Sequence, residues 1–351
     1  MRGVVRGLAG SVTVLLLAVG CQAGSHPRGP VLPVRGAAAT GLEVPWGLAF
    51  LPGGGALVAE RDSARILLVR ASGKPRQVGR VPDVEAGGEG GLLGLAVSPR
   101  FADDHQVYAY YTTSQDNRIA RMTYRDGGLG APEPILTGIP AGGLHNGGRI
   151  VFGPDGYLYA GTGETHQDRL AQDRGSLGGK VLRMTPDGDP APGNPYPGSV
   201  VYSYGHRNVE GLAFDSRGRL WASEFGADTW DELNLIRPGR NYGWPIVEGR
   251  SDDDRYVDPL AVWHTDEASP SGIAIVDDVI YMASLRGQRL WRIPIRGAGV
   301  GKPVAYFIER YGRLRTVAAA PDGTLWLTTS NRDGRGDPRD NDDRILRVDV
   351  S

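Results

Sequence analysis

A phrase that recurs six times along the chain constrains the fold more than any other feature of the sequence. Each copy contains a short apolar run, a turn with Pro, Asp or Gly, and a second apolar or aromatic run, as in RIVFGPDGYLYAGTG and TVAAAPDGTLWLTTS. Apolar runs on both sides of a tight turn predict two antiparallel strands joined by a hairpin. The copies begin at Gly47, Gly94, Arg149, Gly211, Gly272 and Thr316.

The spacing of these copies indicates a β-propeller. Successive copies leave room for a four-stranded blade and a connecting loop, and no segment after residue 40 has a long apolar stripe of helical period. We therefore predict an all-β fold, a six-bladed β-propeller with four-stranded blades. A β-sandwich or two smaller β domains would require the repeats to be coincidental. An open blade leaves unpaired edges, so the last apolar segment, 344–350, is expected to close the ring with an N-terminal strand.

The first 21 residues have the composition of a targeting segment. Arg2 and Arg6 precede an apolar stretch, Leu8 to Gly20, that is too short to span a bilayer comfortably. The stretch ends directly before Cys21, the only cysteine of the chain. This pattern resembles a bacterial lipobox and predicts a lipoprotein signal peptide over residues 1–21. The protein is then exported and lipid-anchored to the outer face of the bacterial cell membrane, with simple secretion as the alternative.

Residues 22–40 are rich in Gly, Ala and Pro and predict a flexible tether, which leaves 41–351 for the propeller. The formal net charge of the chain is −1, whereas nucleic-acid-binding proteins normally carry a basic excess. We therefore expect no nucleic-acid partner, and contact with a membrane only through the lipid anchor.

Polar clusters lie in the loops that enter the blades, where propellers usually carry their functional residues. His145 lies in the Gly-rich sequence HNGGR, and an imidazole is the natural acceptor of a hydroxyl proton near neutral pH. A His that is hydrogen-bonded within a turn is the alternative. Arg207 and Asn208, in GHRNVEG, offer a cation and an amide to an anionic or quinonoid ligand. Glu89, among glycines, could contact a ligand or lie in a turn.

Two further clusters carry charge. The segment SEFGADTWDE, followed by NYGWP, combines carboxylates, carbonyls and a phenol oxygen, which suits Ca²⁺, although a solvated acidic turn is the alternative. Arg313 and Arg315 are two positions apart in a predicted strand and therefore point to the same side. With Arg286 they could bind a polycarboxylate or phosphate, or they could form salt bridges with Asp or Glu.

The order of these clusters resembles that of the soluble PQQ-dependent aldose sugar dehydrogenases, the glucose/sorbosone dehydrogenase family. The motifs GEGGLLGLA, HNGGR, GHRNVEGLAF, DELNLI, NYGWP and RLRTVAAAPDG follow one another between about Pro45 and Val348. The resemblance implies oxidation of an aldose at the anomeric carbon to the lactone, dependent on PQQ and Ca²⁺, with electrons passed to an external acceptor. The alternatives are a non-catalytic cell-surface propeller that binds a glycan or a protein, and a calcium-dependent lactonase.

The resemblance also implies a role for each matching residue. His145 would take the proton from the anomeric hydroxyl while hydride passes to PQQ, and Glu164 would orient it. Arg207 and Asn208 would steady the charge on the reduced quinone. The residues implied around the cofactor are Glu89, Arg207, Asn208, Arg286, Arg313 and Arg315. The residues implied at the Ca²⁺ site are Gly226 and Ala227, through their carbonyls, with Asp231, Glu232 and Tyr242.

Three positions depart from the family pattern. Glu89 stands where members often carry Gln, and its carboxylate should repel those of PQQ unless it is protonated or bridged by a metal. Glu164 stands where an Asp orients the His, and its extra methylene could shift that hydrogen bond. Phe225 replaces a polar neighbour of the cofactor.

Overall fold

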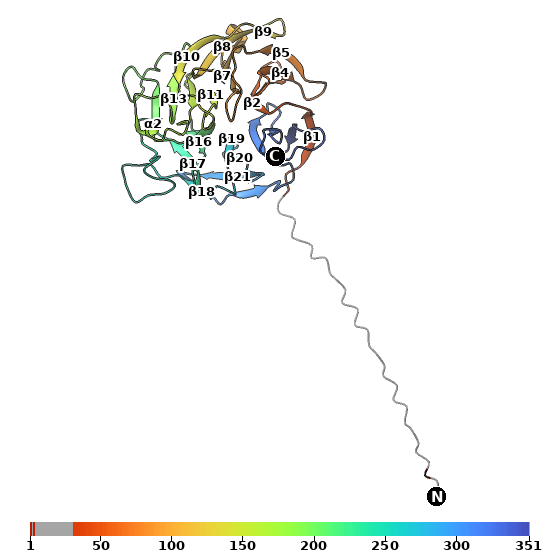
Figure 1. Cartoon of the computed structure of the whole chain (residues 1–351). Coiled ribbons are helices and arrows are strands. Elements are labelled where there is room, and N and C mark those ends of the chain that lie inside the picture. The colour runs from red at the N-terminus through yellow and green to blue at the C-terminus, as the bar shows by residue number, and fades with distance from the viewer. Residues whose placement is uncertain (2, 4–30, 351) are drawn as a thin grey trace.

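The computed structural model describes residues 1, 3 and 31–350, and residues 34–348 form a ring of six antiparallel sheets (Figure 1). The predicted six-bladed propeller is therefore confirmed. Each sheet has four strands along its main path, and in two blades a fifth strand lies off that path: β9, which pairs with β8, and β23, which pairs with β21. Within the described part of the chain, no helix is both long and apolar enough to cross a membrane.

The blades follow one another in chain order. The first three contain β2 (Pro45–Phe50), β3 (Ala56–Glu60), β4 (Arg65–Val69) and β5 (Arg76–Arg80); β6 (Leu92–Val97), β7 (Gln106–Thr112), β8 (Asn117–Arg125), β9 (Gly128–Leu129) and β10 (Glu133–Ile139); and β11 (Ile150–Phe152), β12 (Leu158–Gly161), β13 (Lys180–Met184) and β14 (Val201–Tyr204). Short helices α1 and α2 lie in the loops at Phe101–Asp104 and Arg169–Gln172.

The last three blades complete the ring. They contain β15 (Val209–Phe214), β16 (Leu220–Glu224), β17 (Trp230–Ile236) and β18 (Ala261–His264); β19 (Pro270–Val276), β20 (Val279–Ser284), β21 (Arg289–Arg296), β22 (Gly299–Val300) and β23 (Val304–Tyr306); and β24 (Leu314–Ala319), β25 (Leu325–Thr329), β26 (Ile345–Val348) and β1 (Val34–Ala39).

The sixth blade is built from both ends of the domain. Strand β1 pairs antiparallel with β26, and Val34 lies opposite Val348. The predicted closure by the last apolar segment is therefore confirmed. The chain enters the propeller earlier than predicted, because 34–39 is a strand and not part of a tether. Its sequence, VRGAAA, gives little strand signal, but Ala38 and Ala39 are buried between the sixth and first blades.

The N-terminal predictions concern residues that lie almost entirely outside the described part of the chain. Apart from Met1 and Gly3, the predicted signal peptide and its lipidated Cys21 lie outside the described residues, as does the first part of the tether, 22–30. Export and lipid anchoring stay predictions.

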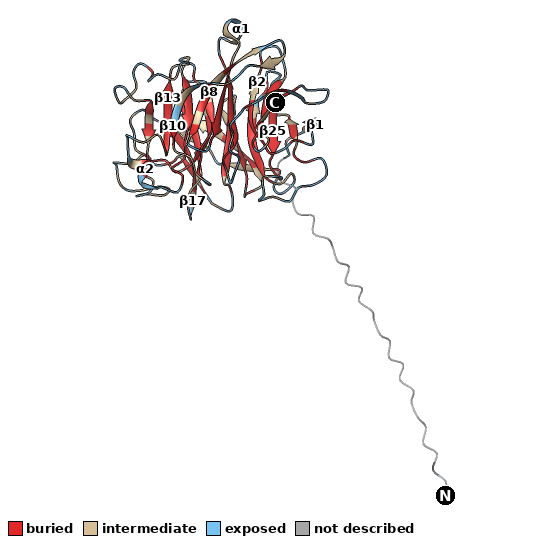
Figure 2. Cartoon of the chain, turned by 45° about the horizontal axis from the view of Figure 1, so that its top comes forward, coloured by how far each residue is buried: buried red, intermediate tan, exposed pale blue. Residues whose placement is uncertain are grey.

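Large side chains between neighbouring sheets hold the ring together, and Figure 2 shows the buried residues concentrated along the strands. Tyr108 meets Phe152 edge to face at 5.1 Å between the second and third blades, and Phe50 meets Trp326 at 5.0 Å between the first and sixth. Edge-to-face pairs of this kind add to the stability gained by burial.

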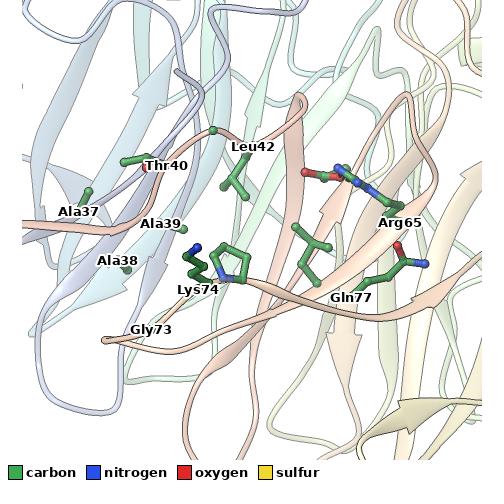
Figure 3. Close-up of a pocket in the computed structure, with 13 residues that line it drawn as sticks. Ala37, Ala38, Ala39, Thr40, Leu42, Arg65, Gly73, Lys74 and Gln77 are labelled. Atoms are coloured by element: carbon green, nitrogen blue, oxygen red, sulfur yellow. Dashed lines mark hydrogen bonds and ion pairs between the residues drawn. The ribbon is translucent and has the colours of Figure 1, made fainter. Parts of the chain in front are cut away.

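The seam where the ring closes contains a cavity of about 610 Å³ (Figure 3). It lies between the segment 37–42 and the outer part of the first blade, and Arg65, Lys74 and Gln77 line it. None of the residues predicted to carry function lines this cavity, so the candidate site lies elsewhere.

Candidate functional site

The loops that enter the inner strands meet at one mouth of the ring and enclose a second cavity, of about 300 Å³. Glu89 precedes β6, Arg313 precedes β24, and the two come together although 224 positions separate them in the sequence. The cavity is lined by Glu89, Glu210, Phe225, Ser269, Leu285, Arg286, Arg313, Arg315 and Arg335. The structure therefore gathers four of the residues predicted around a cofactor: Glu89, Arg286, Arg313 and Arg315.

His145 adjoins this cavity, because its main-chain N–H donates to the lining residue Glu89, and its imidazole is held by a second carboxylate. Its Nδ1 is 2.5 Å from Oε1 of Glu164, and both side chains are buried. A carboxylate accepts, so Nδ1 carries the hydrogen and Nε2 is left as the acceptor of a proton. The longer side chain of Glu164 therefore still forms the hydrogen bond to the imidazole.

Glycines allow the loop of His145 to pack directly on the loop of Glu164. A Cβ on Gly163 would lie 1.9 Å from the carbonyl oxygen of His145, and a Cβ on Gly147 would lie 2.5 Å from that of Gly161. Any larger residue at these two positions would push the loops apart. The local sequences HNGG and GTGE are thus what brings the imidazole and the carboxylate together.

Lys180 anchors the segment 170–178, which follows Glu164 in the chain. Its fully buried ammonium donates to the carbonyl oxygens of Leu170, Ala171 and Gly178, at 2.6, 3.1 and 2.6 Å. Three donors therefore meet three acceptors in the interior, which anchors the segment that follows Glu164.

Arg207 is a partly buried cation whose guanidinium is incompletely hydrogen-bonded in the described structure. Its Nη1 donates to the carbonyl oxygen of Gly226 at 2.6 Å, whereas its Nε is buried without a hydrogen-bond partner in the described structure. Burial lowers the pKa of the guanidinium, and the nearby carboxylates of Glu164 and Glu224 offset this only in part. A cation in this state favours an added anion.

Asn208 is fully buried, which excludes the surface loop that a short polar motif would normally suggest. Its Oδ1 accepts from the main-chain N–H of Gly147 at 2.9 Å, and its Nδ2 makes a long contact of 3.4 Å with Glu210. The amide therefore joins the loop that enters the fourth blade to the loop that carries His145.

The two arginines of the RLR motif share one carboxylate. Nε of Arg313 and Nη2 of Arg315 lie 2.9 and 3.4 Å from the same oxygen of Asp333. Arg315 also pairs with Glu210 at 3.0 Å. The predicted placement of the two guanidinium groups on the same side is confirmed, and salt bridges, the alternative to an anionic ligand, hold both groups. Arg286 lines the same cavity, is exposed, and has no hydrogen bond or ion pair among residues 31–350.

Sequence reasoning missed two charged residues that line the cavity, Glu210 and Arg335, and Asp333, which pairs with the lining residues Arg313 and Arg315. Glu210 lies two positions after Asn208, so strand alternation could have placed the two side chains together. No comparable signal marks Asp333 or Arg335, which belong to a long polar loop.

Arg335 changes the interpretation of Glu89. Its Nη1 lies 2.7 Å from Oε1 of Glu89, while Oε2 accepts from the main-chain N–H of His145 at 2.8 Å. Burial alone would raise the pKa of Glu89, but these two hydrogen bonds outweigh it and lower the pKa. The carboxylate is therefore ionised and paired, and neither of the predicted remedies, protonation or a bridging metal, is required.

The predicted calcium ligands lie in and beside the segment 226–232, and Glu248 shapes this segment. One oxygen of Glu248 accepts from the main-chain N–H groups of Ala227, Asp228, Thr229 and Trp230, at 2.8, 3.0, 3.0 and 3.0 Å. In a trans peptide the C=O points opposite to the following N–H. The carbonyls of Gly226 and Ala227 are therefore turned away from Glu248, and that of Gly226 meets Arg207.

The side chains predicted at the calcium site are already bonded within the protein. Both oxygens of Asp231 accept main-chain N–H bonds, and the hydroxyl of Tyr242 donates to Leu235 and accepts from Arg237. Tyr242 could thus contribute its carbonyl but not its phenol oxygen. Among the described residues no group of three or more His, Cys, Asp or Glu side chains is arranged to hold a metal.

Electrostatics nevertheless favour a cation here. Burial raises the pKa of Asp231 to about 6, and burial together with the neighbouring Glu224 raises that of Glu232 to about 8. A nearby positive charge favours the ionised form of buried carboxylates that repel one another.

Comparison with known proteins identifies what this chain is similar to. Residues 42–346 match the family model described as glucose / sorbosone dehydrogenase. The chain is 28% identical over 329 residues to an aldose sugar dehydrogenase of Escherichia coli, covering 84% of this chain and 89% of that protein. It is 35% identical over 253 residues to quinoprotein glucose dehydrogenase B of Acinetobacter calcoaceticus, covering 62% and 53%.

A solved structure agrees with these matches. The PQQ-bound form of an aldose sugar dehydrogenase from Streptomyces coelicolor superposes with a TM-score of 0.90 at 58% identity. The superposition covers 92% of this chain and 100% of that one.

Proposed function

The chain belongs to the glucose/sorbosone dehydrogenase family, and from this premise we propose that it oxidises an aldose at the anomeric carbon to the lactone, using PQQ and Ca²⁺. The coarse activity follows from the family: the protein is an oxidoreductase, a sugar dehydrogenase of the PQQ type. The observation that carries the finer proposal is the placement of a buried His–Glu pair beside a cavity lined by four arginines.

The residues of the cavity fit an anionic cofactor with several carboxylates. Arg286, Arg313, Arg315 and Arg335 line it together with two carboxylates, Glu89 and Glu210. A third carboxylate, Asp333, is not part of this lining but pairs with Arg313 and Arg315, so the four guanidinium groups still outnumber the carboxylates beside them. Arg207 adds a buried Nε without a partner in the described structure. Ligand carboxylates would complete these guanidinium groups with charge-assisted hydrogen bonds. When bound, PQQ supplies the acceptor for the hydride.

The proton step is assigned to His145. Because Glu164 holds Nδ1–H, Nε2 can take the proton of the anomeric hydroxyl while the C–H bond at the same carbon gives up its hydride. Loss of one proton and one hydride converts the cyclic hemiacetal into the lactone. The Glu164 carboxylate stabilises the imidazolium that results, and it keeps the imidazole in the required tautomer throughout.

We assign Arg207 and Asn208 to the stabilisation of the negative charge that would develop on the cofactor as the sugar is oxidised. The unpartnered Nε of Arg207 is a donor already desolvated, so it needs no reorganisation to stabilise a negative charge. Asn208 holds the loops of His145 and Glu210 in register, and its loosely bonded Nδ2 is the donor that it can offer to a ligand.

For Ca²⁺ we assign the carbonyls of Gly226 and Ala227 as protein ligands, with Asp231 and Glu232 as the nearby negative charge. Carbonyl and carboxylate oxygens are the ligands that Ca²⁺ prefers. The ion would supply Lewis-acid polarisation at the cofactor.

The direct test is reconstitution. Protein stripped of metal is mixed with PQQ and Ca²⁺, and dye reduction is followed over a panel of aldoses, with the dye in place of the unknown external acceptor. We expect PQQ uptake at micromolar concentration and reduction that requires both additions. Absence of PQQ uptake would overturn the proposal. A lactonase has no use for the arginine pair, and lactone hydrolysis without PQQ would favour that alternative.

Replacing Glu248 with Ala is expected to weaken calcium binding by about 10–100-fold, the usual effect of losing a residue that orients metal ligands. Without its oxygen the four N–H groups lose their common acceptor, and the carbonyls of Gly226 and Ala227 lose their fixed direction. The measurement is calorimetric titration of the stripped, PQQ-loaded variant with CaCl₂.

Glu248→Gln is the matched control, because its amide oxygen can still accept these bonds without the charge. We expect it to keep most of the affinity. Equal calcium affinity in Glu248→Ala and the wild type would show that the carbonyls do not depend on Glu248.

A further inference from the structure

A second histidine lies on the face of His145. The rings of His145 and His166 are stacked, with centroids 4.3 Å apart and planes 13° from parallel. His145 is buried, whereas His166 is exposed. The outer imidazole therefore covers one face of the inner one at the mouth of the site.

The backbone that carries His166 is in a conformation that residues with a Cβ avoid. Thr165 and His166 are consecutive and both lie in the left-handed region, at φ values of 57° and 58°. Glycine would adopt this turn without steric cost, and the chain uses glycine at many of its other left-handed positions. Retention of a strained pair next to the site indicates that a side chain is needed here.

Stability does not explain this side chain. Within residues 31–350 neither ring nitrogen of His166 has a hydrogen-bond partner, and its one ring contact is with His145. The turn itself is held by other groups: Gln167 N–H donates to the carbonyl oxygen of Glu164 at 2.9 Å, and Thr165 N–H donates to that of His145 at 3.3 Å.

His145 needs a second restraint. Its imidazole has a single hydrogen bond in the described structure, from Nδ1 to Glu164, and one hydrogen bond alone does not fix the plane of the ring. The other oxygen of Glu164 is buried without a hydrogen-bond partner among residues 31–350, so it adds no restraint on the plane. A flat ring stacked on the imidazole fixes the plane and so the direction of Nε2.

We propose that His166 is a positioning residue, which holds the imidazole plane of His145 so that Nε2 stays directed toward the substrate. This inference rests on the proposed role of His145 as the base. Geometry of this kind matters because a small misplacement of a reacting group costs a large part of the rate.

The test compares two substitutions of His166. His166→Gly removes the ring and relieves the left-handed backbone, and we expect kcat to fall by about 10-fold or more. KM and PQQ uptake should stay close to the wild type, and the melting temperature should not fall. His166→Phe keeps a flat ring and should retain kcat within about twofold, since stacking and not proton transfer is the role assigned. His105→Gly is the control, because His105 is also left-handed, at φ 54°, and its ring contacts Phe101 away from the site.

A readout that needs no cofactor separates this inference from the proposed function. In the stripped protein, the Nδ1–H proton of His145 should give a sharp downfield NMR signal that broadens in His166→Gly and persists in His166→Phe. If the wild type takes up no PQQ, the proposed function fails, whereas an unchanged signal in His166→Gly overturns the positioning role. Unchanged kcat in His166→Gly, a fall in melting temperature that accompanies the loss of kcat, or a Phe variant as slow as the Gly variant would each overturn it as well.

Discussion

Replacing His145 with Ala is expected to lower kcat for aldose oxidation by about 10²–10⁴, the range usual for a general base, while PQQ uptake stays close to that of the wild type. His145 is not among the residues that line the arginine-rich cavity, and it adjoins the lining residue Glu89 through its main-chain N–H, so loss of the imidazole should leave the cofactor contacts intact. The measurement is steady-state dye reduction by the reconstituted variant, with uptake followed separately by titration.

Two comparisons sharpen this prediction. His105→Ala removes an imidazole from the second blade and should leave kcat unchanged. Glu164→Gln should lower kcat as well, because an amide can donate to Nδ1 and so place the hydrogen on Nε2, the wrong tautomer for a base. If His145→Ala turned over as fast as the wild type, another group would have to accept the proton.

The propeller could be predicted because its repeats are local. Each hairpin encodes its own turn and its own apolar runs, and six copies leave few alternatives. Strand β1 could not be predicted in the same way. Its pairing with β26 uses main-chain hydrogen bonds, and its buried side chains are two alanines, so its sequence resembles that of a linker.

The residues of the candidate site also differ in how far the sequence alone could predict them. His145, Glu164 and the arginine pair lie in motifs, so resemblance could point to them. Arg335 reaches Glu89 from 246 positions away, and nothing in its own loop indicates that contact. Glu248 binds only main-chain N–H groups at the segment that it shapes, and such partners leave no residue pattern to detect. Contacts between residues far apart in the sequence, and contacts to main-chain groups, therefore could not be predicted from the sequence.

Changing both Arg313 and Arg315 to Ala is expected to weaken PQQ uptake by about 10²–10⁴. Each charge-assisted hydrogen bond contributes about 1.5–3 kcal/mol, and every 1.4 kcal/mol corresponds to about tenfold in affinity. Both guanidinium groups line the cavity and are held side by side by Asp333, so an anionic ligand would lose both at once. The measurement is titration of stripped protein with PQQ, followed by quenching of tryptophan fluorescence.

The control removes the same charge elsewhere: Arg118 and Arg121 form ion pairs on β8, and their double Ala variant should bind PQQ normally. Normal uptake by the Arg313/Arg315 variant would mean that the cofactor is held by other residues.

Loss of attraction is only part of the expected effect. Without the arginines, Asp333, whose side chain is 2% exposed, and Glu210 would lie uncompensated at the cavity and repel an anion. Adding Asp333→Asn to the double variant should therefore restore part of the affinity if repulsion contributes. If the triple variant binds PQQ no better than the double variant, the whole loss belongs to the missing guanidinium contacts. The double Lys variant, which keeps the charges but not the planar fork, should lie between the wild type and the double Ala variant.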